Sequence, residues 1–469
     1  MKTLETDVAV IGAGTAGLAA YRAARTRGAR AVIVEAGPYG TTCARVGCMP
    51  SKLLIAAAEA SHAIDEAPGF GVHVEGAKRV DGREVMDRVK RERDRFVGFV
   101  VEGVERIPAS DRIAGRARFL DRHTLDVDGH TRVSARAIVI ATGSRPVIPS
   151  ILDGAGDRLL VNDDVFAWDT LPRSVAVFGP GVIGLELGQA LSRLGVRVVV
   201  LGRGGRVGPL ADPIVRESFL KSISEELYVD PDAHVRRVAR ITDGVEVEYT
   251  RLDGTLRTES FDYALAATGR RPNVDGLGLE SLGIELDAAG VPRFDPRTLR
   301  AGDSNLFIAG DASNFIPLLH EAADEGRIAG ENAARLPDVQ PGKRRTPLAV
   351  VFTDPQIAIV GEGFAKLVPG TFEAGEVSFE DQGRTRVMRR NRGHLRVYAD
   401  RASGRFLGAE MAGPAAEHIG HLLAWAAANR MTVASMLEMP FYHPVVEEGL
   451  RTALRDLDAK LRTPQAIAA

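Results

Sequence analysis

A glycine-rich pattern, G-x-G-x-x-G, occurs twice in this chain, each time between an apolar run and a segment of helical composition. The two copies are Gly12-Ala13-Gly14-Thr15-Ala16-Gly17 and Gly179-Pro180-Gly181-Val182-Ile183-Gly184. Such glycines let the backbone approach a pyrophosphate at a helix N-terminus, where free N–H groups and the helix dipole favour an anion. A single copy is weak evidence, but two copies in the same context predict two dinucleotide-binding modules.

Other features repeat between the two halves. An apolar strand ends in an A-T-G turn at 141–143, and the same turn recurs at 267–269. In the first module a second apolar run ends on Glu35, where a carboxylate can accept hydrogen bonds from ribose hydroxyls. The matching run in the second module continues instead into Gly202 and Arg203. An arginine there can pair with a 2′-phosphate, so the sequence leaves both NAD and NADP open.

This duplication organises the whole chain. We expect an α/β fold with two Rossmann-like dinucleotide-binding domains and a C-terminal α+β domain, and FAD with a nicotinamide nucleotide is the economical pair of ligands. The expected ranges are a first dinucleotide-binding domain at 1–150, a second at 151–274, a central segment at 275–345 and a last domain at 346–469. Between Lys78 and Glu105 the apolar residues recur at helical spacing among charges, which predicts a long solvated helix with Val85, Val89, Phe96, Phe99, Val100 and Val104 on one face.

Charge and hydropathy exclude several classes of partner. The 469 residues include 60 basic and 62 acidic ones, a formal net charge of −2 that gives no electrostatic footprint for nucleic acid. No apolar run approaches the roughly 18 residues of a membrane span, and no secretory signal is visible at the N-terminus. We therefore expect a cytoplasmic protein with neither nucleic acid nor membrane as its partner.

The chain has only two cysteines, Cys43 and Cys48, in the segment G-T-T-C-A-R-V-G-C-M-P-S-K. A structural disulfide would be unusual in a cytosolic protein of this size, and a metal site would need further Cys or His ligands close by. A redox-active dithiol without metal is the favoured interpretation. Pro50 and Ser51 suggest that Cys48 begins a helix, whose dipole, together with Lys52, would favour a thiolate.

A histidine near the C-terminus, His443, is followed five residues later by Glu448. A lone histidine is more often structural than catalytic. A dithiol, however, needs a proton acceptor with a pKa near neutrality, and a carboxylate could hold the imidazole in the useful tautomer. Spacing alone leaves both interpretations open.

Taken in order, these motifs resemble the class I flavoprotein pyridine nucleotide-disulfide oxidoreductases, the family of dihydrolipoyl dehydrogenase, glutathione reductase and mercuric reductase. The resemblance spans nearly the whole chain and rests on the first glycine turn with Glu35, the C-x-x-x-x-C-x-P-S-K segment, Gly115, the two A-T-G turns, the second glycine turn, Ala309-Gly310-Asp311 and the final His-Pro with its glutamate. It implies that Cys43 exchanges disulfides with substrate and that Cys48 forms a thiolate contact with the flavin. It also implies a homodimer in which His443 from the partner subunit is the acid/base, oriented by Glu448.

The resemblance implies that 1–150 is the FAD-binding domain, completed by the central segment 275–345, that 151–274 is the NAD(P)-binding domain, and that 346–469 is the dimerisation (interface) domain. It also assigns cofactor contacts. Lys52 would lie by the flavin, paired with Glu186, and Asp311 would hold the ribityl chain. The other residues that it implies at the cofactor sites, besides the two glycine turns, Glu35 and Arg203, are Gly115, Thr142, Gly143, Gly269 and His320.

Within the family the pattern is most similar to dihydrolipoyl dehydrogenase, which oxidises dihydrolipoamide with NAD⁺ and serves the lipoyl domains of 2-oxoacid dehydrogenase complexes. The alternative is an NAD(P)H-dependent reductase of another acceptor, such as a low-molecular-weight disulfide, a metal ion or a quinone. A more distant alternative is a flavin and nicotinamide sensor that does not turn over. Two cysteines alone disfavour mercuric reductase and the large thioredoxin reductases, which use a further C-terminal pair. Thr41, Arg45 and Val445 depart from the family pattern around the dithiol and the base.

Overall fold

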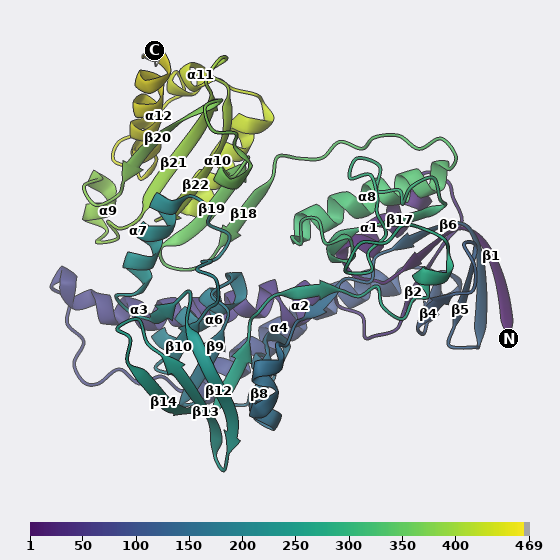
Figure 1. The fold of residues 1–469 in the computed structure, drawn as a ribbon, viewed down its shortest axis with the longest axis horizontal. Helices are drawn as coiled ribbons and strands as arrows, with labels where there is room; N and C mark the ends of the chain where they lie inside the picture. Colours follow the sequence, from purple (N-terminus) through teal and green to yellow (C-terminus); the bar gives the residue numbers. More distant parts are fainter. Residues whose placement is uncertain (464–469) are drawn as a thin grey trace.

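The computed structural model describes residues 1–463, and its first sheet has seven strands (Figure 1). The order is β3-β2-β1-β6-β5-β4. On the edge of β6 opposite to β1, β5 pairs with the first half of the strand and β17 with its last three residues. All pairings among β3, β2, β1, β6 and β17 are parallel. β17 therefore brings a distant segment of the chain into the first sheet. The strands are β1 (Lys2–Ile11), β2 (Ala31–Glu35), β3 (Arg112–Ala114), β4 (Ala117–Phe119), β5 (Thr124–Val127), β6 (Thr131–Ile140) and β17 (Leu306–Ile308).

Two helices, α1 (Thr15–Thr26) and α8 (Leu319–Arg335), pack side by side against this sheet (Figure 1). Their backbones touch because the facing residues are small. A Cβ atom on Gly326 would lie 2.1 Å from the carbonyl oxygen of Ala16, and one on Gly330 would lie 2.2 Å from that of Ala20. This contact fixes α8 beside the helix that follows the first glycine turn.

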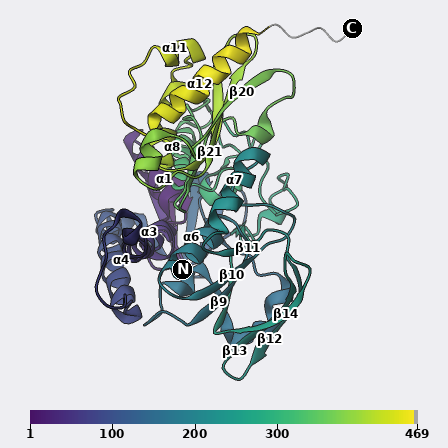
Figure 2. The same ribbon diagram turned by 90° about the vertical axis from the view of Figure 1, so that its left-hand side faces the viewer.

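The second module has its own five-stranded parallel sheet, in the order β11-β10-β9-β15-β8. A three-stranded antiparallel sheet, β12-β13-β14, lies beside it (Figure 2). The elements are β8 (Leu159–Val161), α5 (Asn162–Val165), β9 (Ser174–Phe178), α6 (Val182–Arg193), β10 (Arg197–Leu201), α7 (Pro213–Ile223), β11 (Tyr228–Asp230), β12 (His234–Ile241), β13 (Gly244–Thr250), β14 (Leu256–Phe261) and β15 (Tyr263–Ala266).

The segments that leave the two A-T-G turns pair with each other. They form an antiparallel ribbon of β7 (Ser144–Pro146) and β16 (Arg270–Pro272), with Arg145 opposite Arg271. The chain thus enters and leaves the second module at one place.

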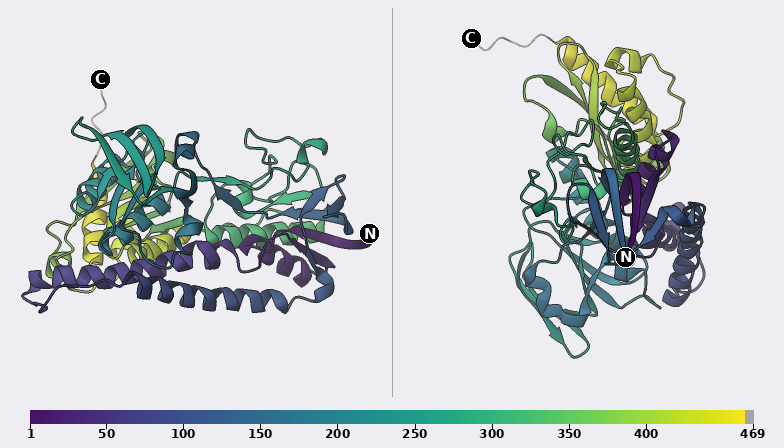
Figure 3. Two further views of the ribbon diagram at one scale, coloured as in Figure 1. Left: turned by 90° about the horizontal axis from the view of Figure 1, so that it is seen from below. Right: turned by 90° about the vertical axis from the view of Figure 1, so that its right-hand side faces the viewer.

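Two long helices, α3 (Cys48–Glu66) and α4 (Gly82–Glu105), lie side by side along one surface of the molecule, after the short α2 (Thr42–Val46) (Figure 3). The predicted start of α3 at Cys48 is confirmed. The second helix is shorter than predicted, because the Asp81 side chain accepts the N–H groups of Arg83 and Glu84 and so caps it. Its buried residues are Met86, Val89 and Val104, whereas Phe99 is exposed. Only part of the predicted apolar face is therefore buried.

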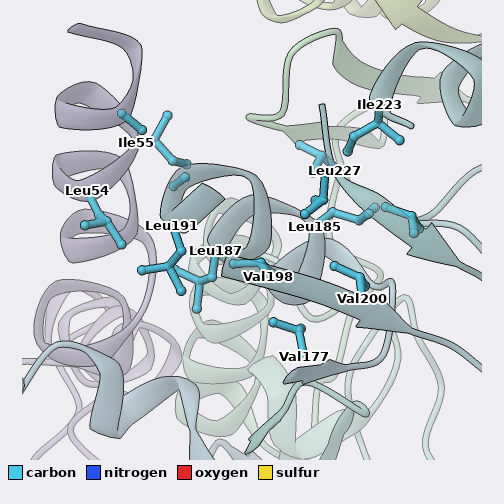
Figure 4. Packing of buried hydrophobic residues seen from close by; sticks show 14 of the residues in the cluster. Leu54, Ile55, Val177, Leu185, Leu187, Leu191, Val198, Val200, Ile223 and Leu227 are labelled. Carbon is cyan, nitrogen blue, oxygen red and sulfur yellow. The ribbon is translucent and has the colours of Figure 1, made fainter. Parts of the chain in front are cut away.

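The helix that begins at Cys48 is held by apolar packing against the second module. Leu54 and Ile55 of α3 belong to the same buried cluster as Leu187 and Leu191 of α6, with the strands β9 and β10 behind them (Figure 4). Burial of each such side chain contributes about 1.5–3 kcal/mol. The dithiol helix and the nucleotide-binding helix α6 therefore form one packed unit.

The C-terminal domain is a five-stranded antiparallel sheet, β18-β19-β22-β21-β20, with helices packed on it. Helix α7 of the second module reaches up to β21 and β22 (Figure 2). The elements are β18 (Leu348–Val351), β19 (Gln356–Gly361), β20 (Phe372–Ser378), α9 (Gly383–Val387), β21 (His394–Asp400), β22 (Phe406–Gly413), α10 (Ala416–Ala428), α11 (Val433–Leu437) and α12 (Glu447–Arg462). Short 3₁₀ turns are η1 (Ala67–Phe70), η2 (Ala109–Asp111), η3 (Ser150–Arg158), η4 (Leu279–Ser281), η5 (Gly310–Ser313) and η6 (Phe364–Lys366).

The predicted fold class, two Rossmann-like modules followed by an α+β domain, is confirmed. Among residues 1–463, no helix has the length and apolar character needed to cross a membrane.

Candidate active site

Two free thiols stand at adjoining helices: Cys43 lies in α2, and Cys48 is the first residue of α3. The Cys43 side chain hydrogen-bonds to Cys48, and this bond together with the Lys52 ammonium lowers the pKa of Cys48 to about 7. The same bond, followed by burial, raises the pKa of the Cys43 thiol. Near neutral pH, Cys48 is therefore the sulfur that becomes a thiolate and Cys43 the one that keeps its proton.

Lys52 and Glu186 form the predicted ion pair. The Lys52 ammonium lies 2.9 and 2.7 Å from the two oxygens of a carboxylate whose side chain is only 5 % exposed. Glu186 also accepts the backbone N–H of Phe352 at 3.0 Å, and the ammonium stands 4.7 Å from the centre of the Phe352 ring. One carboxylate thus connects the dithiol helix, the second module and the C-terminal domain, and it fixes where the ammonium lies. Phe352 was not singled out from the sequence, because no motif marks it.

The first glycine turn combines tight packing with open space. A Cβ on Gly17 would lie 1.8 Å from the carbonyl oxygen of Gly12, so this position closes the turn onto the helix. A Cβ on Gly14 would have no atom within 4 Å. The Glu35 carboxylate accepts the N–H of Ala13 at 2.7 Å, and so it stands at the turn, as predicted for a ribose-binding acid. Gly115 donates its N–H to the backbone oxygen of Glu35 at 2.9 Å.

Polar atoms without partners lie around the same turn. Thr142 Oγ1 and His320 Nε2 are buried and make no hydrogen bond within residues 1–463. A Cβ on Gly143 would again meet nothing within 4 Å. Asp311 accepts the hydroxyl of Ser144 at 2.7 Å. Buried polar groups are almost always hydrogen-bonded, so these orphan atoms together with open backbone fit a large polar ligand such as FAD at the carboxyl ends of the parallel strands.

Two supports of this site were missed from the sequence. Ser144 follows the A-T-G turn directly and could have been found from that position. Glu325, wholly buried in α8, accepts the N–H of Gly310 at 2.8 Å and lies 3.2 Å from the Ser313 hydroxyl. It holds the backbone of Gly310 and the side chain of Ser313, on either side of Asp311, and no local motif reveals it.

The second glycine turn reproduces the first. A Cβ on Gly184 would lie 1.9 Å from the carbonyl oxygen of Gly179, whereas one on Gly181 would come no closer than 3.9 Å to another atom. Gly269 has φ +109° and open space at its Cβ, as Gly143 has in the first module. The second module therefore presents the same kind of pyrophosphate site.

Strand register shows which residue replaces the ribose-binding acid. The N–H of Gly12 bonds to Val34 and that of Gly179 bonds to Leu201, at 2.7 and 2.8 Å. The next residues, Glu35 and Gly202, are therefore equivalent.

No acidic side chain fits at position 202. A Cβ on Gly202 would lie 2.5 Å from the carbonyl oxygen of Pro231 and 2.7 Å from the ring of Pro180. The two arginines that follow, Arg203 and Arg206, are exposed. Arg206 was missed from the sequence, although the run G-R-G-G-R displays it. This end of the second module therefore carries two exposed arginines and has no acid at the position equivalent to Glu35.

His443 and Glu448 form the predicted pair, with His443 Nδ1 2.9 Å from the carboxylate. Arg451 donates to the other oxygen at 2.8 Å. Although desolvation acts in the opposite direction, the hydrogen bonds from His443 and from the Val445 N–H lower the pKa of Glu448. The His443 side chain is 81 % exposed, and no hydrogen bond or ion pair joins it to either cysteine in the described chain. The ring is oriented but faces outward from its own subunit.

Two family models together match most of the chain. The description "Pyridine nucleotide-disulphide oxidoreductase" matches residues 6–326, and the dimerisation domain of the same family matches residues 348–454. The chain belongs to the pyridine nucleotide-disulphide oxidoreductases. Members of this family bind FAD and NAD(P), and so does this chain. The dimerisation domain supports a homodimer.

Relatives of this oxidoreductase carry different names. It is 30 % identical to a dihydrolipoyl dehydrogenase of Bacillus subtilis over 95 % of this chain and 97 % of the relative. It is 31 % identical to a mercuric reductase of Shigella flexneri over 97 % of this chain and 81 % of the relative. Among solved structures, LpdA from Mycobacterium tuberculosis superposes with a TM-score of 0.81 at 27 % identity, over 97 % of this chain and 99 % of that one. The oxidoreductase is thus a flavoprotein disulfide oxidoreductase.

Proposed function

We propose that this oxidoreductase is of the dihydrolipoyl dehydrogenase type, working in the cytoplasm as a homodimer with a lipoyl-bearing dithiol as substrate. The observation that carries the proposal is the pair of thiols with opposite pKa shifts beside Lys52. The oriented His443 on the dimerisation domain supports it, because an outward-facing base suits the dithiol of the other subunit. The four domain ranges given from the sequence stand as part of this proposal, as does a 2-oxoacid dehydrogenase complex as partner.

The proposed chemistry begins with Cys43 and Cys48 joined as a disulfide. One substrate thiol loses its proton to His443 and attacks Cys43, and Cys48 leaves as a thiolate. The second substrate sulfur then attacks the first, its proton passes to Cys43, and Cys43 leaves as a thiol. The substrate is oxidised to a disulfide and the enzyme disulfide is reduced. FAD, when bound, supplies a two-electron acceptor that passes the pair to the pyridine nucleotide.

A second candidate, the NADPH-dependent reduction of a small disulfide, rests on one specific observation. Gly202 leaves no room for the acid that would repel a 2′-phosphate, and Arg203 and Arg206 follow it. The same reaction steps would then proceed in the opposite direction. Cys48 would receive the electron pair, and Cys43 would attack the substrate disulfide.

An anaerobic spectral titration separates the two candidates. The purified yellow protein is titrated with NADH, with NADPH and with dihydrolipoamide, and the long-wavelength charge-transfer band of Cys48 is followed. A band raised by dihydrolipoamide and by NADH supports the dihydrolipoyl dehydrogenase type. A band raised by NADPH alone favours the second candidate, and no band with any donor contradicts both.

A further inference from the structure

The loop 202–212 follows β10 and carries Arg203 and Arg206, and it is held at several points. The Gly204 N–H donates to the Asp232 carboxylate at 2.6 Å, next to the end of β11. The Gly208 N–H then donates to the carbonyl oxygen of Pro180 at 2.7 Å, inside the second glycine turn. The loop is therefore tied to the second glycine turn on its way to α7.

The far end of this loop is held by a residue of another domain. Glu410 lies on β22 of the dimerisation domain and is 1 % exposed. One of its oxygens accepts the N–H groups of Ala211 and Asp212 at 2.9 and 2.8 Å. The other accepts the N–H of Phe364, in its own domain, at 2.8 Å. A single buried carboxylate thus clamps the loop to the C-terminal sheet.

Asp212 extends the clamp into helix α7. Its carboxylate, wholly buried, caps α7 at the N–H of Ile214 and receives hydrogen bonds from Arg396 and the Tyr398 hydroxyl, both at 2.8 Å. Charge-assisted hydrogen bonds of this kind are strong and directional. The end of the loop can therefore not move without breaking contacts to β21 and β22.

We propose that Glu410 is a positioning residue for the pyridine nucleotide, through which the dimerisation domain sets the conformation of the loop 202–212. The inference rests on the second module being the nucleotide site of the proposed function. Without the Glu410 carboxylate, the N–H groups of Ala211 and Asp212 lose their acceptor, and the loop that carries Arg203 and Arg206 is then held to the C-terminal sheet by the Asp212 carboxylate alone. Nucleotide affinity then falls while the dithiol chemistry is unchanged.

The test uses the holoenzyme and the variant Glu410→Gln, whose amide keeps the shape but turns an NH₂ group or a weaker oxygen toward the loop. The dissociation constants of NADP⁺ and NAD⁺ are measured by titration, and flavin reduction by dihydrolipoamide is followed by stopped flow. For the tighter nucleotide we expect a rise of about tenfold in Kd, the size of a lost charge-assisted hydrogen bond. The dihydrolipoamide reaction is expected to keep its wild-type rate.

A matched control is Thr385→Val, which removes a wholly buried hydroxyl in the same domain without a contact to the loop. Its nucleotide Kd is expected to stay at the wild-type value. An unchanged Kd in Glu410→Gln, or an equal rise in Thr385→Val, overturns the proposal. Arg203→Ala distinguishes a failure of the nucleotide site from a failure of the role of Glu410. If the nucleotide Kd rises in Arg203→Ala but is unchanged in Glu410→Gln, the second module still binds the nucleotide and only the positioning role of Glu410 is contradicted.

A measurement on the wild-type holoenzyme covers the case in which Glu410→Gln does not fold. Saturation with the tighter nucleotide is expected to slow hydrogen exchange in peptides covering 203–212 and also in the peptide containing Phe364, which shares the Glu410 carboxylate. Protection confined to the second module would contradict the proposal.

Discussion

The ammonium of Lys52 lies one helical turn beyond Cys48 and is held 2.7 Å from the carboxylate of Glu186. Its positive charge lowers the pKa of Cys48, and Glu186 opposes this effect. The ion pair therefore places the Lys52 cation by the Cys48 thiolate and also limits how far that cation lowers the pKa of Cys48.

Alkylation of the reduced protein reports this thiolate. With iodoacetamide and peptide mass spectrometry, we expect the rate at Cys48 to rise with pH around a midpoint of about 7, because only the thiolate reacts. Below that midpoint the thiolate is protonated and the rate falls. Cys43 is expected to react only at much higher pH.

Removing the cation tests its part in that midpoint. Lys52→Gln should move the Cys48 midpoint upward, whereas Lys78→Gln, which loses an ion pair with the half-exposed Asp65, should leave it in place. An unchanged midpoint in Lys52→Gln would mean that the Cys43 hydrogen bond alone sets the pKa.

The proposed base is tested by substitution. His443→Gln should lower kcat for dihydrolipoamide oxidation by about 10²–10⁴-fold, the range of general acid–base catalysis. His418→Gln is the control, since this exposed histidine also stands by a glutamate, Glu417, in the same domain. Equal rates for the two variants would remove His443 from the mechanism.

Whether the base acts across the dimer is a separate question. Mixing Cys43→Ser subunits with His443→Gln subunits, each inactive alone, gives heterodimers in which one site keeps both groups. A statistical mixture should recover about a quarter of wild-type activity, because half of the dimers carry one of two sites. No recovery would place His443 in the site of its own subunit.

Nucleotide choice is tested at the ribose end of the second module. Arg203→Ala with Arg206→Ala should raise KM for NADPH by at least about tenfold and leave KM for NADH nearly unchanged, because only NADPH carries the 2′-phosphate. Arg236→Ala, an exposed arginine on β12 of the same module, should change neither value. A parallel change in both nucleotides would show that the arginines do not read the phosphate.

Helix contact in the first module offers a stability test. Gly330→Ala places a Cβ 2.2 Å from the carbonyl oxygen of Ala20 and should destabilise the protein by about 1–3 kcal/mol. Gly98→Ala, in the interior of α4 with open space around it, should stabilise by about 0.5–1 kcal/mol. Thermal unfolding followed by flavin fluorescence compares them, and equal midpoints would contradict the packing argument.

The sequence predicted the structure best where a turn or a helix start requires one particular type of residue. The glycine turns and the Cys48 helix start follow from short motifs, whereas the Lys52–Glu186 pair was implied by the family resemblance. The polar contacts between domains could not be read this way, because their partners are far apart in the chain. Phe352, Glu325 and Glu410 carry no signal of their own, and each acts through backbone N–H groups that every residue but proline possesses. The apolar face of α4 is only partly buried, because helical spacing alone does not say which neighbour will cover it.

The ribbon of β7 and β16 has a consequence for how the chain is built. Since Pro146 and Arg270 are paired, the whole second module is an insertion into a single connection of the first, and β17 resumes the first sheet as if the insertion were absent. The first copy of the duplication is thus discontinuous in sequence and continuous in space, and the inserted copy could be exchanged as a unit without rethreading the flavin-binding sheet.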